Sequence, residues 1–219
     1  MHCLIFANGE PNDGPMVQRA LAEAQTAETL LVLAADGGAR LAAYFGYVPQ
    51  VIIGDMDSIS AQQLAALEVL GAQISRYPTE KDATDLELAF IHAVQRGARW
   101  IRVIGAIGSR LDQVMANVYL LALDILRPCD VQIVADKQAT RLLHPGTHTI
   151  LGQAGDTVSL IPMADQAEGI RTEGLYYPLD NERLVFGPTR GVSNVMQASE
   201  ARVSLRSGKL LLVHTVGRA

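Results

Sequence analysis

The sequence has few of the features that mark several large classes of protein. It contains two cysteines, Cys3 and Cys129, each inside an apolar segment and far apart in the chain. Such a pair indicates neither a disulfide framework nor a thiolate metal site, and we expect two buried thiols. No apolar run approaches the ~18 residues of a membrane span, and the first residues lack the charged region of a signal peptide. These absences predict a cytoplasmic protein without a membrane partner.

Positive charge is also scarce. Lys and Arg number 18 against 23 Asp and Glu, which gives a net charge of −5 and a pI near 5.5. Without a basic run or basic helix face, neither nucleic acid nor an anionic membrane is expected as the main partner. The chain also lacks the Gly-rich signatures of P-loop kinases and of dinucleotide-binding oxidoreductases. A small phosphorylated ligand, carried with its metal, remains compatible with this composition.

The first part of the chain, residues 1–136, alternates apolar runs with helical patterns. Runs of this kind, separated by helices, predict a parallel sheet covered on both faces, with ligand loops at the carboxyl ends of its strands. We therefore predict an α/β domain here. The six runs are Cys3 to Ala7, Leu30 to Ala34, Val51 to Ile53, Gln73 to Arg76, Trp100 to Ile104 and Val131 to Ala135.

Two carboxylates follow the third run one residue apart. Asp55 and Asp57 come directly after Gly54, on a loop that leaves a predicted parallel strand. Carboxylates at this spacing suit a hard cation such as Mg²⁺, which takes one or two protein oxygens and adds substrate phosphates. The alternative is that both are ordinary turn residues and that Ser58 or Ser60 starts the next helix.

Further acidic residues lie near other strand ends. Asp36 precedes Gly37 and Gly38, a pair of glycines that either lets backbone amides approach a ligand or serves a steric need at a strand-to-helix turn. Asp85 lies in the first turn of a predicted helix that Thr84 caps. Acidic residues favour helix N-termini through the helix dipole, which is the alternative explanation there.

The loop after the fifth run, residues 105–112, suits a phosphate. It contains Gly105, Gly108 and Arg110, and an arginine offers phosphoryl oxygens a planar fork of donors. The alternative is that Arg110 is solvated or paired with Asp112.

The pattern changes at about Lys137. Short β-rich segments and frequent glycines follow, and no stretch has helical periodicity. Residues 137–219 are therefore predicted to form a second domain, an antiparallel sandwich or barrel. The predicted strands are Thr147 to Leu151, Thr157 to Ile161, Glu168 to Glu173, Arg183 to Phe186, Glu200 to Leu205 and Lys209 to Thr215.

Five motifs, taken together and in this order, resemble the thiamin pyrophosphokinase family over nearly the whole chain. They are Asp36-Gly37-Gly38, Gly54-Asp55-Met56-Asp57-Ser58, Lys81-Asp82-Ala83-Thr84-Asp85, Gly105-Ala106-Ile107-Gly108-Ser109-Arg110-Leu111-Asp112 and Gly191-Val192-Ser193-Asn194. The resemblance implies an N-terminal parallel-sheet α/β catalytic domain, a C-terminal all-β sandwich domain that helps bind thiamin, and a homodimer with active sites between subunits. It also implies transfer of the pyrophosphoryl group of ATP to thiamin, with Mg²⁺ and release of AMP.

The resemblance assigns roles position by position. Asp55, Asp57 and Asp85 would bind metal and triphosphate, and Asp112 would lie close to the reacting end, so that these residues and Arg110 form the expected catalytic set. Nucleotide contacts would come from Asp36, Gly37, Gly38, Lys81 and Arg110. Ser193 and Asn194 would contact the thiamin ring.

One position departs from the family. Many members carry histidine directly after the residue that matches Asp112, whereas this chain carries Gln113. Glutamine hydrogen-bonds but does not shuttle a proton near neutral pH. One alternative is therefore a non-catalytic nucleotide or thiamin sensor. A second alternative, which keeps the same sheet and aspartates, is a related ATP-dependent transferase that uses another small alcohol.

Overall fold

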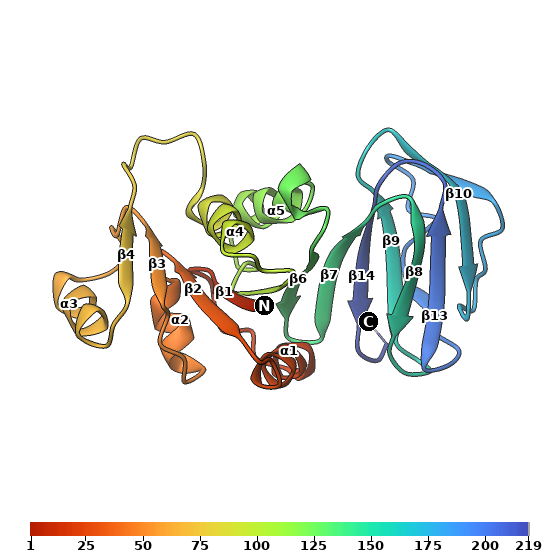
Figure 1. The fold of residues 1–219 in the computed structure, drawn as a ribbon. Coiled ribbons are helices and arrows are strands. Elements are labelled where there is room, and N and C mark those ends of the chain that lie inside the picture. Colours follow the sequence, from red (N-terminus) through yellow and green to blue (C-terminus); the bar gives the residue numbers. More distant parts are fainter. Residues whose placement is uncertain (219) are drawn as a thin grey trace. The chain divides into compact units, whose positions relative to one another are not determined.

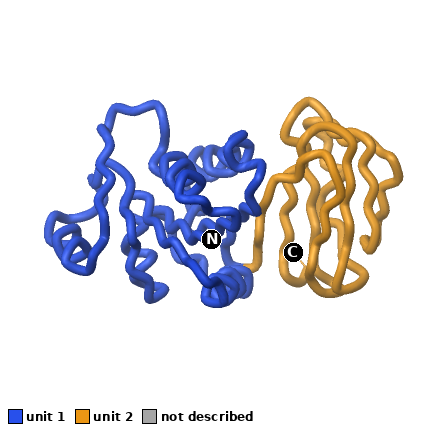
Figure 2. The backbone as a smooth tube through the Cα atoms, in the orientation of Figure 1, with its two compact units in different colours: residues 1–136 blue, residues 137–219 orange. Residues whose placement is uncertain are grey.

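The computed structural model describes residues 1–218. The chain folds into two compact units, one from Met1 to Asp136 and the other from Lys137 onward (Figure 2). Each unit has its own strands and its own buried core.

A sheet of parallel strands forms the centre of the first unit. Its order is β4-β3-β2-β1-β5-β6, and His2 of β1, for example, pairs with Leu30 of β2 and with Trp100 of β5. The predicted parallel sheet is therefore confirmed. The strands are β1 (His2–Phe6), β2 (Leu30–Ala35), β3 (Val51–Gly54), β4 (Gln73–Arg76), β5 (Trp100–Ile104) and β6 (Asp130–Ala135).

Helices connect these strands and cover both faces of the sheet. In Figure 1, α4 and α5 lie over one face, and α1 and α2 lie under the other. Local sequence explains two starts: Ser60 and Gln63 form the predicted capping box before α3, and the Thr84 hydroxyl accepts a hydrogen bond from the Glu87 N–H at the start of α4. The helices are α1 (Pro15–Gln25), α2 (Gly38–Tyr44), α3 (Ala61–Val69), α4 (Asp85–Gln95) and α5 (Leu111–Leu120), followed by the short 3₁₀ turn η1 (Asp124–Leu126).

The strand order creates a crevice at one point of this sheet. β1 lies between β2 and β5, so the connections after β1 and after β5 leave toward opposite sides. In open α/β sheets, ligands bind outside the carboxyl ends of the strands at such a switch point. The loops after β1 and β5 therefore border the position where a ligand is expected.

The second unit contains two antiparallel sheets, ordered β12-β9-β14-β7 and β11-β10-β13-β8. Buried residues of both sheets, such as Leu160 of β9, Leu212 of β14 and Val203 of β13, share one apolar core. The predicted β sandwich is confirmed. Its strands are β7 (Gln138–Leu143), β8 (Gly146–Leu151), β9 (Thr157–Pro162), β10 (Gln166–Glu173), β11 (Glu182–Val185), β12 (Asn194–Val195), β13 (Glu200–Leu205) and β14 (Leu210–Thr215).

Some details differ from the expectations. Cys3 is buried as predicted, but Cys129, which lies between η1 and β6, is partly exposed, so the prediction of two buried thiols is wrong for Cys129. The sequence pattern does not predict strands β7 and β12. None of the helices in the described part of the chain combines the length and the apolar character needed to cross a membrane.

Candidate active site

Three of the predicted acidic residues lie together at the carboxyl ends of β2 and β3. Asp36 follows β2, whereas Asp55 and Asp57 follow β3, and one carboxylate oxygen from each lies within 4.8 Å of the others. Within the Asp55 loop, the Asp57 N–H donates to Asp55 Oδ1 at 3.2 Å, and the Ser58 hydroxyl donates to Asp57 Oδ1 at 2.9 Å. The loop thus holds its two carboxylates beside Asp36.

Asp85, the fourth predicted residue, reaches the same place from the start of α4. Gly54 allows this approach, because a Cβ at its position would lie 3.1 Å from Asp36 Cβ and 3.1 Å from Asp85 Cγ. Gly54 also has a φ of 152°, a conformation that residues with side chains rarely adopt. The glycine before Asp55 is therefore part of the acidic site.

Lys81 accompanies these carboxylates. Its Nζ lies 3.1 Å from Asp85 Oδ1 and 4.0 Å from Asp55 Oδ2. One ammonium faces four carboxylates, counting Asp36 and Asp57, so the cluster keeps an excess of negative charge. A cation would lower the repulsion between these groups.

The pKa values of two carboxylates in this cluster, Asp55 and Asp85, are shifted in opposite directions. The Asp57 N–H is the main cause that holds the pKa of Asp55 below its ordinary value, and Thr79 and Lys81 add to it. Burial raises the pKa of Asp85, Lys81 opposes that rise, and the charges of Asp36 and Asp55 add to it. Burial thus makes the charge of Asp85 costly, and a cation would offset that cost.

Asp36 is the carboxylate in this cluster with the clearest capacity to bind a cation. The residue is only 6% exposed, and its Oδ1 is buried without a hydrogen-bond partner among the described residues. A buried carboxylate oxygen is costly to leave unpaired. The oxygen set of Asp36, Asp55 and Asp57 fits a hard cation such as Mg²⁺.

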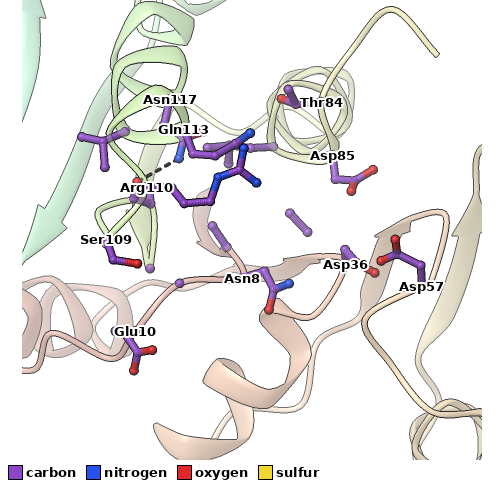
Figure 3. A pocket seen from close by; sticks show the side chains of 18 of the residues that line it. Asn8, Glu10, Asp36, Asp57, Thr84, Asp85, Ser109, Arg110, Gln113 and Asn117 are labelled. Carbon is purple, nitrogen blue, oxygen red and sulfur yellow. Dashed lines mark hydrogen bonds between the residues drawn. The ribbon is translucent and has the colours of Figure 1, made fainter. Parts of the chain in front are cut away.

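A pocket of about 630 Å³ adjoins the cluster, within the range of small-molecule sites. Its lining comes from the loops after β1, β2, β3, β4 and β5 and from the starts of α4 and α5. In Figure 3, Asp36 and Asp57 lie next to each other, Asp85 extends from the start of α4, and Glu10 and Ser109 lie toward the other end. The pocket therefore joins an acidic end to the glycine-rich loop.

Arg110 lines this pocket, but its guanidinium is already paired. Nη2 donates to Asp112 Oδ2 at 2.6 Å and Nε donates to Asp112 Oδ1 at 3.3 Å. The hydrogen bond raises the pKa of Arg110 and lowers the pKa of Asp112. Both side chains are exposed, at 69% and 65%, so this pair contributes little stability.

Gly37 and Gly38 have a steric explanation. A Cβ at Gly37 would collide with the side chain of Asn8, and a Cβ at Gly38 would collide with the Phe6 carbonyl group. The two glycines let the start of α2 pack against the loop after β1. Their contact with a nucleotide stays a prediction.

The pocket also contains residues that the sequence did not single out. Asn8 lies after β1, where its Oδ1 accepts a hydrogen bond from Arg40 Nη2 at 2.9 Å. Asn117 lies on α5 and donates from Nδ2 to the Ala106 carbonyl oxygen at 2.8 Å. Only the position of Asn8 in the sequence, directly after a strand at the switch point, could have indicated that it lines the pocket.

Ser193 and Asn194 lie in the second unit, beside another pocket of about 280 Å³. Asn194 lines this pocket, and Ser193 is exposed directly before it. Ser193 has a φ of 60°, and its N–H donates to Ser159 Oγ at 3.0 Å. The structure thus places the two groups of predicted site residues in different units.

Residues 23–133 match the family model for the thiamin pyrophosphokinase catalytic domain, and residues 147–210 match the model for the thiamin pyrophosphokinase vitamin B1 binding domain. The chain belongs to the thiamin pyrophosphokinase family. The two matched regions contain both pockets' motifs, from Asp36 to Arg110 and from Gly191 to Asn194. The predicted family is thereby confirmed.

Individual relatives agree with this membership. Thiamine pyrophosphokinase of Bacillus subtilis is 27% identical over 191 residues, which cover 87% of this chain and 89% of that protein. Thiamine pyrophosphokinase 1 of Arabidopsis thaliana is 30% identical over 210 residues, covering 83% and 76%. The crystal structure of thiamine pyrophosphokinase from Bacillus subtilis superposes with a TM-score of 0.86 at 25% identity, covering 99% of each chain.

Proposed function

We propose that this protein transfers the pyrophosphoryl group of ATP to the hydroxyl of thiamin, giving thiamin diphosphate and AMP. The hydroxyl oxygen forms a bond to the β-phosphorus, the bond from that phosphorus to the bridging oxygen of AMP breaks, and the hydroxyl proton leaves. The observation that carries the proposal is the cluster of Asp36, Asp55 and Asp57 beside the 630 Å³ pocket, in a chain of the thiamin pyrophosphokinase family.

The acidic end of the pocket is the proposed magnesium site. Asp55, Asp57 and Asp85 would hold Mg²⁺ with help from the unpaired Oδ1 of Asp36. When bound, Mg²⁺ supplies positive charge that neutralises the phosphate oxygens during transfer. Dependence of the activity on magnesium is part of this proposal.

Cationic side chains are proposed to orient the triphosphate. Arg110 exchanges Asp112 for phosphate oxygens and gives them its fork of donors, while Lys81 provides a point charge between Asp55 and Asp85. The release of Arg110 leaves Asp112 free at the rim, where its carboxylate can accept the proton of the attacking hydroxyl. The backbone of Gly37 and Gly38, directly after Asp36, is proposed to complete the nucleotide side.

The acceptor side is proposed to lie in the second unit, around Ser193 and Asn194. This region belongs to the part of the chain that matches the vitamin B1 binding domain. Under this proposal the first unit, which lines the acidic pocket, binds the nucleotide, and the second unit, which lines the smaller pocket, binds the acceptor.

We further propose a homodimer in which sites form between subunits. The feature that favours a partner subunit is one face of α5. This face carries three exposed apolar side chains at every fourth residue, Leu111, Met115 and Tyr119. Sedimentation equilibrium of wild type and of Met115→Glu tests this part, and a monomeric wild type would contradict it.

A cytoplasmic location belongs to the same proposal. The proposed co-substrate ATP is supplied there, and both cysteines are free thiols, as is usual in that compartment. Fractionation of cells that express the protein from its own gene is the corresponding measurement.

Product analysis tests the proposed reaction. Purified protein is incubated with ATP, thiamin and Mg²⁺, and the nucleotides and thiamin esters are separated by chromatography. The proposal predicts AMP and thiamin diphosphate in equal amounts, and none of either after removal of divalent cations with EDTA. ADP with thiamin monophosphate would instead show transfer of a single phosphoryl group.

The same assay separates the two alternatives. A non-catalytic sensor, favoured by Gln113 in place of the family's histidine, would bind ATP and thiamin without forming either product. A transferase for a different small alcohol would consume ATP only when that alcohol replaces thiamin. The match to the vitamin B1 binding domain favours thiamin over another alcohol as the acceptor, and turnover distinguishes the kinase from the sensor.

A further inference from the structure

The smaller pocket in the second unit has a wall that depends on a single amide side chain. Its lining includes Leu160, Tyr177 and Val192, together with Asn194. The volume of about 280 Å³ lies at the lower edge of the range for small-molecule sites. Tyr177 comes from the segment between β10 and β11, whereas Asn194 begins β12.

The side chain of Asn194 points at the backbone of Tyr177. Its Oδ1 accepts from the Tyr177 N–H at 2.9 Å, and its Nδ2 donates to the Tyr177 carbonyl oxygen at 2.6 Å. Oδ1 also accepts from the Val195 N–H at 2.9 Å. The amide therefore pairs with Tyr177 on both sides, as a neighbouring strand would.

This pairing decides what Asn194 can offer a ligand. A carboxamide has two lone pairs and two N–H donors, and three of these four positions are used within the protein. The residue is 9% exposed, so the amide cannot turn outward without leaving buried backbone groups unpaired. Asn194 is thus poorly placed to read the donors and acceptors of a ring, and well placed to fix Tyr177.

The segment that carries Tyr177 is held at other points as well. The Tyr176 N–H donates to the Val195 carbonyl oxygen at 2.9 Å, and the Leu179 N–H donates to Thr172 Oγ1 at 2.8 Å. Between these points, the hydrogen bonds described for the Tyr177 backbone are those to Asn194. The Tyr177 side chain is 64% exposed, with its ring 4.8 Å from that of Tyr176, so packing alone does not fix it.

We propose that Asn194 is a positioning residue, which holds the backbone of Tyr177 so that the Tyr177 side chain forms one wall of the site for the aromatic rings of the acceptor. This rests on the proposed function, since it takes thiamin as the acceptor. The ring contact expected of Asn194 is thereby replaced by an indirect role through Tyr177.

A double-mutant cycle tests this role. Thiamin is titrated by calorimetry into wild type, Asn194→Ala, Tyr177→Ala and the double variant. Because both single changes remove the same wall, each should weaken thiamin binding about 10-fold, and the double variant should be no more than about 10-fold weaker than wild type. Binding of a non-hydrolysable ATP analogue should stay unchanged in all four proteins.

Amide hydrogen exchange gives a readout that needs no ligand. In Asn194→Ala, the Tyr177 N–H should exchange much faster, while the Leu179 N–H, which Thr172 holds, should keep its protection. Asn194→Asp should also speed exchange of the Tyr177 N–H, because a carboxylate oxygen would then face the Tyr177 carbonyl oxygen in place of the donating amide. Ile150→Ala, in the same core but outside the pocket, is the control: it should lower the melting temperature and leave thiamin affinity unchanged.

The outcomes separate this role from the function on which it rests. A double variant that is about 100-fold weaker would mean independent contacts and would overturn the positioning role, as would unchanged affinity in Tyr177→Ala. Tyr177 lies at the surface, so this last variant stays informative even where Asn194→Ala does not fold. A wild type that binds no thiamin would overturn the proposed function itself.

Discussion

Asp36 in the first unit and Asp156 in the second are both buried, but their surroundings are opposite. Asp156 Oδ2 accepts from His214 Nε2 at 2.8 Å and from the Gln153 N–H at 2.9 Å, and its Oδ1 accepts from the Gly217 N–H at 2.8 Å. Asp36, by contrast, has a buried Oδ1 without a hydrogen-bond partner among the described residues, and it lies beside Asp55 and Asp57.

The difference separates a carboxylate whose partners lie within the protein from one that we propose binds a cation. The partners of Asp156 close the loop after β8 onto the end of β14, and they stabilise the fold of the second unit. Burial instead raises the pKa of Asp85, and the buried Oδ1 of Asp36 has no hydrogen-bond partner among the described residues, so a cation would stabilise this site. Sites that bind ligands are often less stable than they could be for this reason.

The largest expected effect is on turnover. Asp57→Asn keeps the shape of the side chain but loses the charge that would hold Mg²⁺ against the phosphates, so kcat should fall about 1,000-fold with the fold intact. Rates of thiamin diphosphate formation at saturating Mg²⁺ measure this. Glu68→Gln on α3, the same change at an exposed site outside the pocket, is the matched control. Near-wild-type turnover in Asp57→Asn would remove Asp57 from the metal site.

Asp156→Asn should act on stability and not on nucleotide binding. Loss of charged hydrogen bonds to His214 and two backbone N–H groups should lower the free energy of unfolding of the second unit by about 2–3 kcal/mol near neutral pH. Urea denaturation followed by circular dichroism measures it, with the exposed Glu173→Gln as control. If Asp156→Asn weakened the binding of an ATP analogue, Asp156 would not be a purely structural carboxylate.

The cost of Asp156→Asn should also depend on pH. Burial by itself raises the pKa of Asp156, but the Gly217 N–H, the His214 ring and the Gln153 N–H together hold it below its ordinary value. A depressed pKa in the folded state gives stability that is present above the ordinary value of about 3.9 and is lost as pH falls through the folded pKa. The difference between wild type and variant should therefore shrink in acid, and a constant difference would contradict this.

Arg110→Lys should have a smaller effect. A point charge replaces a planar fork, so kcat/KM for ATP should fall about 10-fold although the charge is kept. Arg19→Lys on α1, where the arginine also pairs with a carboxylate at the surface, is the control. If Arg110→Lys kept full activity, Arg110 would serve only its pair with Asp112.

The smallest expected effect is a gain in stability. Without divalent cations, Asp36→Asn should raise the free energy of unfolding by about 1 kcal/mol, because it removes an unpaired buried charge near Asp55 and Asp57. For a chain of this size this corresponds to about 2–4 °C in melting temperature. Asparagine also tolerates the φ of 46° at this position. A loss of stability would show that the Asp36 charge is satisfied after all.

The sequence predicts the parallel sheet and the acidic loops because both depend on local signals. Apolar runs such as Trp100 to Ile104 locate strands, and since parallel strands end at one edge, Asp36 and Asp55 had to come close. The start of α4 at Asp85 follows from the Thr84 cap in the same way. These signals extend over a few residues and need no knowledge of tertiary contacts.

The remaining features depend on contacts between distant residues. Strand β12 has two residues, too few for a pattern, and the inward direction of Asn194 arises from pairing with Tyr177, 17 positions earlier. The places of Asn8 and Asn117 in the first pocket follow from packing of the loops after β1 and β5. Composition and spacing carry no signal for such contacts.

The measurement that tests the central claim most directly is thermal unfolding of wild type and Asp36→Asn, each with and without Mg²⁺ and a non-hydrolysable ATP analogue. If the acidic cluster is a cation and phosphate site, ligand should raise the melting temperature of wild type by several degrees. Asp36→Asn should begin higher and rise much less. An equal rise in both proteins would contradict the claim that Asp36 helps to bind the metal and its nucleotide.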